Sequence, residues 1–187
     1  MKLYMAIIHY PVTNKHGDLV TTSITNFDIH DMGRTAATFG VKTVFLVNPV
    51  PSQQWFAKRV VRHWTDGAGA AYNPTRHESM NHVALSNDLG EMVEAITTEE
   101  EQAPQLVVTS ARALPNSVSY ENLREKLATG DTPYCLLFGT GWGLHPEIVE
   151  EADLVLPPIE GPSDYNHLSV RAAAAIILDR LCGRRQT

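Results

Sequence analysis

The chain has 187 residues, which is the usual length of one domain, so we expect residues 1–187 to form a single domain. Hydrophobic residues make up 43% of it and charged residues 19%, a composition that excludes intrinsic disorder. The formal net charge of −6 excludes a protein that coats nucleic acid through bulk charge, but it leaves room for a local basic patch.

Two further features bear on the cellular setting of the chain. The two cysteines, Cys135 and Cys182, are too few for a disulfide scaffold, so we expect a reduced, cytoplasmic environment. The sequence holds no run of about 18 apolar residues, so we expect no membrane span.

Expected strands and helices alternate along the first half of the chain. They are inferred from apolar periodicity and from the glycines, prolines and capping residues that bound each segment. In chain order we expect a strand at residues 3–12, a helix at 29–39 that begins near Asp28 and stops at Gly40, and a strand at 43–47. A helix from Ser52 to Thr65 is expected next, followed by a flexible joint at 67–71 and a polar segment at 72–78. A weak strand or turn at 82–85 and a helix at 86–97 complete this half.

The second half continues the alternation. It is expected to hold a strand at 106–109, a helix at 120–128, a strand at 134–138, a short helix at 146–151, a strand at 153–156 and a helix at 172–181. The unbroken apolar run of residues 134–138 is typical of a parallel strand buried on both faces. The pattern therefore predicts an α/β domain with a mostly parallel sheet and helices on both faces. Ligands of such sheets bind beyond the carboxyl ends of the strands, here after Val12, Val47, Thr109, Phe138 and Leu156.

A glycine-rich segment follows the buried strand that ends at Phe138. It reads Gly139-Thr140-Gly141-Trp142-Gly143-Leu144, with glycines at alternate positions. Glycines allow positive φ and close approach of a flat ligand such as a purine, although the spacing differs from the dinucleotide motif G-x-G-x-x-G. A ligand loop and an ordinary glycine-rich turn both fit this segment alone.

A proline-rich segment at residues 156–162 leads into a polar cluster before the final helix. Asn166, His167 and Ser169 in this cluster are able to donate hydrogen bonds to a ligand or to cap the helix. The alanines that follow indicate close packing, either of the helix on the sheet or of the helix within a dimer.

Several cations are candidates for binding phosphate. Arg34 lies among small residues of an expected helix, where it is able to present its guanidinium to a phosphate or to extend into solvent. Lys58, Arg59, Arg62 and Arg76 are interleaved with Trp55, Trp64 and Tyr72. That mixture suits RNA, and it also suits a solvated amphipathic helix.

The sequence offers little for metal or covalent chemistry. Its eight histidines and two cysteines show no H-x-x-x-H or C-x-x-C spacing, so we expect no metal. Cys135 is placed in a buried strand and Cys182 near a helix end, and neither has the surroundings of an activated nucleophile.

Three of these segments together resemble the motifs of the SPOUT (α/β-knot) RNA methyltransferases. They are residues 28–41 with Gly33-Arg34-Thr35-Ala36-Ala37, residues 137–144 with the glycine-rich segment, and residues 156–177 with Asn166 and Ser169. Within that superfamily the chain is most similar to a small group of stand-alone bacterial proteins related to tRNA (guanine-N1)-methyltransferases. The resemblance covers nearly the whole chain.

The resemblance implies a C-terminal trefoil knot that holds S-adenosylmethionine (SAM), and a homodimer with its active site between subunits. Sequence patterning alone would not suggest a knot, because knots are close to absent from proteins. The implied cofactor contacts are Thr109, Ser110, Phe138, Gly139, Thr140, Gly141, Gly143, Leu144, Leu156, Pro158, Ile159, Gly161, Asn166, His167, Leu168 and Ser169.

The resemblance further implies catalytic roles for Arg34, Asp28 and Asn166. Ribose-methylating relatives usually carry asparagine at the place of Asp28 and a glutamate among the glycines, where this chain has Thr140 and Trp142. The target, a base nitrogen or a ribose 2′-oxygen, is therefore left open. Asp28 either acts as a base or caps its helix. The implied RNA contacts are Arg34, Lys58, Arg59, Arg62 and Arg76.

The leading hypothesis is thus a SAM-dependent methyltransferase acting on tRNA or rRNA, without a metal. Two alternatives remain at this point: an RNA-binding knot protein without catalysis, and an α/β enzyme that binds another nucleotide at the glycine-rich segment.

Overall fold

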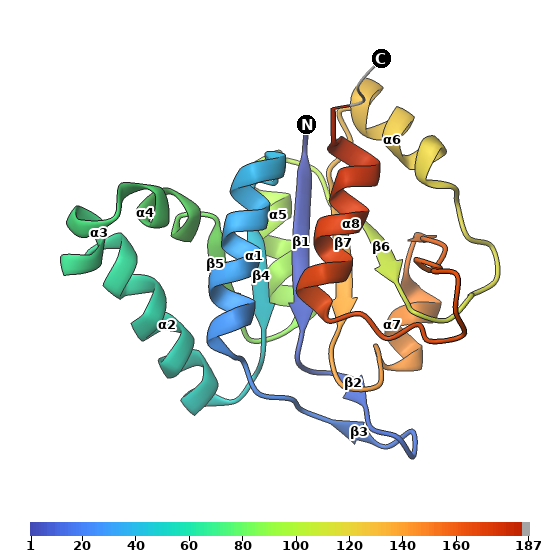
Figure 1. The fold of residues 1–187 in the computed structure, drawn as a ribbon, viewed down its shortest axis with the longest axis horizontal. Coiled ribbons are helices and arrows are strands. Elements are labelled where there is room, and N and C mark those ends of the chain that lie inside the picture. The colour runs from blue at the N-terminus through green and yellow to red at the C-terminus, as the bar shows by residue number, and fades with distance from the viewer. Residues whose placement is uncertain (185–187) are drawn as a thin grey trace.

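A six-stranded sheet, parallel throughout, forms the centre of the computed structural model, which describes residues 1–184 (Figure 1). The predicted domain end at residue 187 lies outside the described residues. The strands, in their order across the sheet, are β5 (Val83–Ser86), β4 (Val44–Val47), β1 (Leu3–Ile8), β7 (Tyr134–Gly139), β6 (Gln105–Thr109) and β8 (Leu154–Val155). The predicted fold class, an α/β domain with a mostly parallel sheet, is confirmed.

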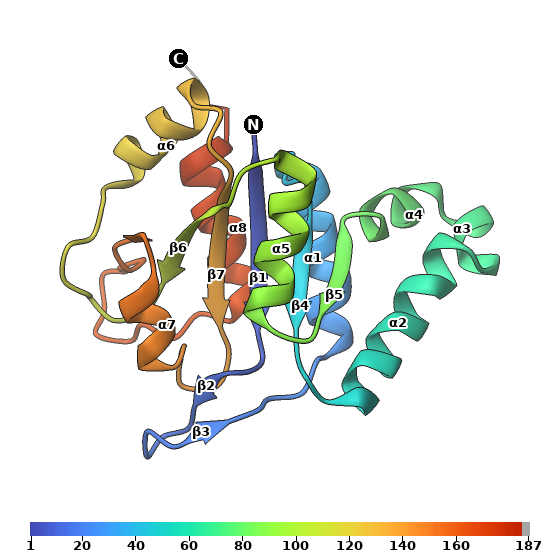
Figure 2. The same ribbon diagram turned by 180° about the vertical axis from the view of Figure 1, so that it is seen from behind.

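Helices cover both faces of the sheet, and a further group of helices extends beyond one edge (Figures 1 and 2). One face carries α1 (Asn26–Phe39), α6 (Tyr120–Thr129) and α8 (Val170–Cys182), and the other carries α5 (Leu89–Glu100) and α7 (Pro146–Glu151). Beyond β5 lie α2 (Pro51–Thr65), α3 (Ala68–Tyr72) and α4 (Pro74–Met80). No helix in residues 1–184 is both long and apolar enough to cross a membrane.

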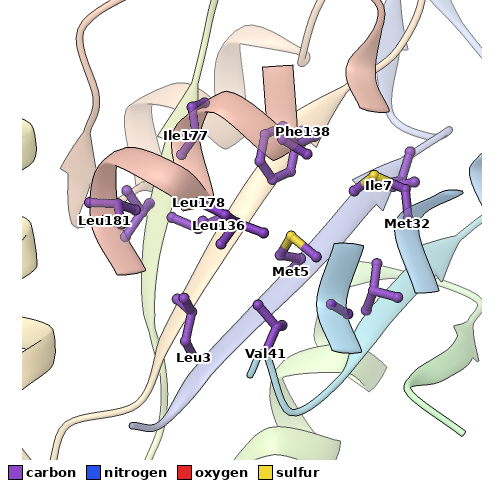
Figure 3. Packing of buried hydrophobic residues seen from close by; sticks show 14 of the residues in the cluster. Leu3, Met5, Ile7, Met32, Val41, Leu136, Phe138, Ile177, Leu178 and Leu181 are labelled. Carbon is purple, nitrogen blue, oxygen red and sulfur yellow. The ribbon is translucent and has the colours of Figure 1, made fainter. Parts of the chain in front are cut away.

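The central strand β1 is buried along its whole length. The sheet separates the hydrophobic core into two clusters, one on each face, and β1 contributes to both. Leu3, Met5 and Ile7 point towards α1 and α8, where they meet residues such as Met32 and Leu178 (Figure 3). The intervening residues of β1 point to α5 and α7. This alternation follows from the two-residue period of a strand.

Two predicted segments have a different structure. The strand expected at residues 3–12 ends at Ile8, since Pro11 has no N–H to continue the hydrogen bonds of the main sheet. The residues that follow form β2 (Val12–Thr13), which pairs with β3 (Leu19–Val20) in a small separate sheet. The flexible joint and polar segment predicted for residues 67–78 form the helices α3 and α4. Pro74 begins α4, and the Asn73 side chain accepts a hydrogen bond from the Arg76 N–H, which is the chemistry of a capped helix.

The helix α1 ends at Gly40 as predicted, but it begins at Asn26, three residues before the expected start at residue 29. Thr25 and Asp28 form a capping box at its start, because each side chain accepts a hydrogen bond from the other residue's backbone N–H. Gly40 ends the helix in the left-handed conformation with φ of 69°. Asp28 therefore stabilises the helix start, one of the two roles that the sequence leaves open.

Candidate cofactor and RNA site

The carboxyl ends of the six parallel strands meet at one edge of the sheet. The loops after β1, β4, β7, β6 and β8 therefore lie together, and the β2–β3 hairpin lies beside them (Figure 2). This is the edge at which open α/β sheets bind ligands. It brings together the predicted cofactor residues of the second and third motif segments. Arg34, the predicted catalytic and RNA-binding residue of the first segment, lies farther along α1.

The glycine-rich loop is built by close backbone contacts. A Cβ on Gly139 would lie 2.6 Å from the backbone nitrogen of Leu144, and Gly141 and Gly143 have positive φ of 60° and 115°. β2 fixes the loop further, because the Trp142 N–H donates to the Thr13 carbonyl and the Thr13 N–H donates to the Gly143 carbonyl, each at 3.0 Å. The glycines are thus required by the loop's own shape, and they leave its backbone open to a ligand.

A partly buried series of hydrogen bonds lies beside this loop. His9, which follows β1, is 1% exposed, and its Nδ1 lies 2.9 Å from the hydroxyl of Thr22. The Thr22 hydroxyl contacts that of Thr140, which donates to the Ile8 carbonyl at 2.9 Å. Asn48, which follows β4, donates from Nδ2 to the Thr22 carbonyl at 3.0 Å. Side chains from the ends of β1, β4 and β7 are therefore joined.

The same histidine faces the predicted catalytic residue Asp28. The Nε2 of His9 lies 3.8 Å from Oδ2 of Asp28, whose side chain is 17% exposed. Burial lowers the pKa of His9, and the negative charge of Asp28 only partly opposes that effect. We therefore expect His9 to be neutral at physiological pH.

The third motif segment folds against the loop that follows β6. Asn166 donates from Nδ2 to the Ala111 carbonyl at 2.8 Å, and the Tyr120 hydroxyl donates to the Pro157 carbonyl at 3.0 Å. Leu156 is buried, whereas Leu168 is 47% exposed. One segment connects β8 to Ser169, the residue before α8. This segment contains the predicted cofactor residues Leu156, Pro158, Ile159 and Gly161.

The remaining predicted cofactor residues lie near the ends of β6 and β7. The Thr109 hydroxyl donates to the Leu137 carbonyl at 2.8 Å, and Ser110 accepts the Arg112 N–H. Phe138 is buried beneath the glycine-rich loop, and the His167 ring stands edge-on to Tyr165. These contacts shape the loops, while the glycine-rich backbone and Leu168 remain accessible.

Arg34 lies away from this edge, on the outer surface of the domain. It lines a groove of about 480 Å³ between α1 and α8. Arg171 lines the same groove, pairs with Asp31 at 3.4 Å and covers the ring of Phe27. Since Asn26 begins α1 at the strand ends and Arg34 follows about two turns later, the guanidinium is separated from the glycine-rich loop of its own chain.

Apart from Arg34, the four predicted RNA-binding residues divide into two groups. Lys58, Arg59 and Arg62 are exposed and, with Trp55, fall within about 100° of one another around α2 at helical spacing. Arg59 covers the Trp55 ring at 5.5 Å. Arg76 is on another surface, where it bonds the His30 ring at 2.8 Å and covers Trp64. The structure therefore places three of the four cations on one face.

Three residues of the site are missing from the sequence-based set: His9, Thr22 and Asn48. Each is polar, and His9 and Asn48 directly follow strands of buried apolar residues. A polar residue directly after a buried parallel strand is the signal that would have identified His9 and Asn48. Thr22 has no such signal, because a loop brings it to the site.

The cysteines are inert, as predicted. Burial raises the pKa of both thiols, that of Cys182 to about 11, so neither is a thiolate at neutral pH. Within the described part of the chain, no three side chains of His, Cys, Asp or Glu gather as a metal site.

Similarity to known proteins now identifies the family. Residues 2–183 match the model of a family described as SAM-dependent RNA methyltransferases. An uncharacterized protein of Aquifex aeolicus is 39% identical over 184 residues, which cover 98% of this chain and 90% of that protein. A tRNA (guanine-N(1)-)-methyltransferase of Oleidesulfovibrio alaskensis is 41% identical over 181 residues. That alignment covers 97% of this chain but only 42% of the relative.

The fold also matches solved structures. TrmJ from Zymomonas mobilis superposes with a TM-score of 0.61 at 14% identity, covering 100% of this chain and 71% of that one. The fold is that of the SPOUT methyltransferases, as the motif resemblance implied. SAM is therefore the cofactor, which decides against another nucleotide, and RNA is the substrate class. The chain belongs to the family of SAM-dependent RNA methyltransferases.

Proposed function

We propose that this protein transfers the methyl group of SAM to a tRNA. The observation that carries the proposal is the glycine-rich loop at the carboxyl edge of the sheet, within a chain of this family. The choice of tRNA is supported by relatives that are named tRNA (guanine-N(1)-)-methyltransferases and are 41% identical. This chain spans only 42% of their length, so their activity is a proposal for this chain.

The residues at the strand edge fit SAM. The open backbone of the loop from Gly139 to Gly143 suits a flat purine, and the partly buried Ile159, in the segment that follows β8, supplies apolar surface. When bound there, SAM supplies an activated methyl group on its sulfonium. The cofactor contacts inferred from the resemblance, from Thr109 to Ser169, are retained in this proposal.

The protein's part in the reaction is to orient the RNA and accept a proton. The Asp28 carboxylate, held by Thr25 and facing His9, takes the proton that a ring nitrogen or hydroxyl releases as it is methylated. Arg34 binds a phosphate or stabilises charge that develops on the nucleotide. Asn166, fixed through Ala111, presents its remaining polar atoms to the ligands.

The working unit of this proposal is a cytoplasmic homodimer. Arg34 is remote from the glycine-rich loop of its own chain, so an active site that uses both needs a second copy. The groove between α1 and α8, lined by Arg34, Thr38 and Ala172, is the surface that we propose the copies share. Free cysteines agree with the reduced compartment.

We further propose that the chain is a single domain with a trefoil knot. The contacts of Asn166 with Ala111 and of Tyr120 with Pro157 bring residues 157–169 against the loop after β6, which is where such a knot would thread. A crystal structure traced through both segments tests this path.

The decisive experiment for the function is a methylation assay. Purified protein is incubated with SAM and bulk tRNA, with rRNA in a parallel reaction, and the nucleosides are identified by mass spectrometry. We expect one methylated nucleoside in tRNA, whose identity names the target atom. Methylation of rRNA alone would contradict the choice of tRNA. Binding of RNA without methylation of either RNA would favour the non-catalytic knot protein.

A further inference from the structure

We infer that His9 is a positioning residue that fixes the glycine-rich loop through Thr22, and that it does so as the tautomer protonated on Nδ1. The inference rests on the proposed function only in taking that loop as the cofactor site. His9 is 1% exposed, so it touches neither RNA nor cofactor and acts through its neighbours.

The tautomer follows from the direction of the hydrogen bonds. The Ile8 carbonyl accepts from the Thr140 N–H at 3.2 Å and, at the shorter distance of 2.9 Å, from the Thr140 hydroxyl, which uses its single proton in that bond. The Thr22 hydroxyl must then donate to the oxygen of Thr140. Because the proton of Thr22 is used in this way, its oxygen accepts from His9, and Nδ1 of His9 must carry a proton.

The opposite ring nitrogen shows that this arrangement has a cost. With Nδ1 protonated in a neutral ring, Nε2 carries a lone pair, and it has no hydrogen-bond partner among residues 1–184. It faces the Asp28 carboxylate at 3.8 Å, where a lone pair is not favoured. A histidine present only to fill space would turn its N–H towards that carboxylate. The chain to Thr140 therefore determines the protonated nitrogen.

Two hydrogen bonds to the backbone of Thr22 hold this residue in place between His9 and Thr140. The Thr22 N–H donates to the His9 carbonyl at 2.9 Å, and Asn48 donates to the Thr22 carbonyl at 3.0 Å. The Thr22 hydroxyl is thus fixed between the imidazole and the glycine-rich loop. We expect loss of His9 to loosen the loop and so to weaken cofactor binding.

The first test is ¹⁵N NMR of the histidine rings in the full-length protein at neutral pH. The inference expects the proton of His9 on Nδ1, and a proton on Nε2 would overturn it. This measurement needs no cofactor, so its result is independent of the proposed function.

The second test compares two conservative replacements. His9→Asn keeps a polar atom near the place of Nδ1, whereas His9→Gln keeps one near the place of Nε2. We expect the Gln variant to bind SAM about tenfold more weakly in calorimetry, the effect of one buried hydrogen bond, and the Asn variant to stay within about threefold of the wild type. Equal losses in the two variants would contradict the inference.

Thr22→Val gives a third readout that leaves the histidine in place. We expect the same loss of about tenfold in SAM affinity, with little change in kcat, while Thr21→Val at the exposed neighbour keeps wild-type affinity. Combining Thr22→Val with His9→Gln should weaken binding no more than either change alone. Additive losses would show that the two residues act separately. A wild-type protein that binds no SAM would instead contradict the proposed cofactor site.

Discussion

The carboxylate of Glu100 joins three side chains at the end of the sheet opposite the glycine-rich loop. The Glu100 side chain is 4% exposed, and it accepts hydrogen bonds from Tyr4 and Lys42, at 2.5 Å each, and pairs with Lys2 at 3.2 Å. Burial on its own would raise the pKa of Glu100, but the bonds from Lys42, Tyr4 and Lys2 outweigh burial and lower it to about 2. This residue therefore couples α5 to the central strand through charge.

The depressed pKa gives a prediction for stability against pH. A carboxyl group whose pKa falls from 4.5 to about 2 on folding stabilises the folded state above its unfolded pKa and loses that effect as the pH falls towards 2. We expect Glu100→Gln to lower the free energy of unfolding by about 2 kcal/mol at pH 7 and by much less near pH 2. Urea denaturation across pH measures this. Glu94→Gln, at an exposed site of α5, is the control, and a pH-independent difference would contradict the prediction.

Gly139 offers a second prediction at the same scale. Its added Cβ would lie 2.6 Å from the Leu144 nitrogen, which forces the backbone of the glycine-rich loop to move. We expect Gly139→Ala to weaken SAM binding by at least about tenfold in calorimetry, the loss of about 1.4 kcal/mol. Gly90→Ala in the first turn of α5, where only an Asp88 side-chain oxygen lies near, should bind as the wild type does. Normal binding by Gly139→Ala would show that SAM does not need this loop.

Among the helices, α2 differs most between its exposed face and its buried face. One face carries Trp55, Lys58, Arg59 and Arg62, which are exposed, while Ala57 on another face is buried in the core. The exposed face combines cations with an aromatic ring already covered by a guanidinium. That combination suits a phosphate backbone with an unstacked base.

We expect this face to bind RNA. Lys58→Ala combined with Arg62→Ala should weaken tRNA binding and reduce the slope of log affinity against log salt by about two, one for each lost cation. Fluorescence anisotropy over a series of salt concentrations measures this. Lys126→Ala, at an exposed site of α6, is the matched control. An unchanged salt slope in the double variant would place the RNA elsewhere.

At the scale of the whole molecule, the predicted cofactor loop and the predicted catalytic residue Arg34 lie on two separate surfaces. The glycine-rich loop is at the strand edge, and Arg34 is in the groove between α1 and α8. A shared active site in a twofold dimer reconciles them, because the partner would supply the missing arginine.

Mixing two inactive variants tests that arrangement. Arg34→Ala lacks the arginine, and Gly139→Ala disrupts the cofactor loop, so a mixed dimer would hold one intact site. We expect about one quarter of wild-type activity after equal amounts are unfolded and refolded together, from the statistics of a symmetric dimer. Each variant refolded alone is the control. Activity no greater than that of the single variants would mean that each site lies within one chain.

The sequence predicts the frame of the molecule well and the details of its site less well. Apolar runs identify five of the six strands of the main sheet, because burial in a parallel sheet leaves a clear pattern, whereas the sequence leaves the half-buried β5 open between a strand and a turn. The helices α3 and α4 were missed, since short helices with glycine and polar residues have no clear period. The link from His9 to Thr140 could not be predicted, because it joins residues that are 131 positions apart only once the sheet has formed.

The strand order carries a consequence for synthesis on the ribosome. β5, β4 and β1 all precede residue 101, whereas β6, β7 and β8 all follow residue 104, and the two sets meet only where β1 pairs with β7. The pairing of β1 with β7 ends at Ile8 and Gly139, where the glycine-rich loop begins. A nascent chain that has emerged only as far as α5 therefore lacks the strand that closes its centre. The glycine-rich loop, our proposed cofactor site, can form only when the two halves of the sheet join, so a bound cofactor would mark a completed molecule.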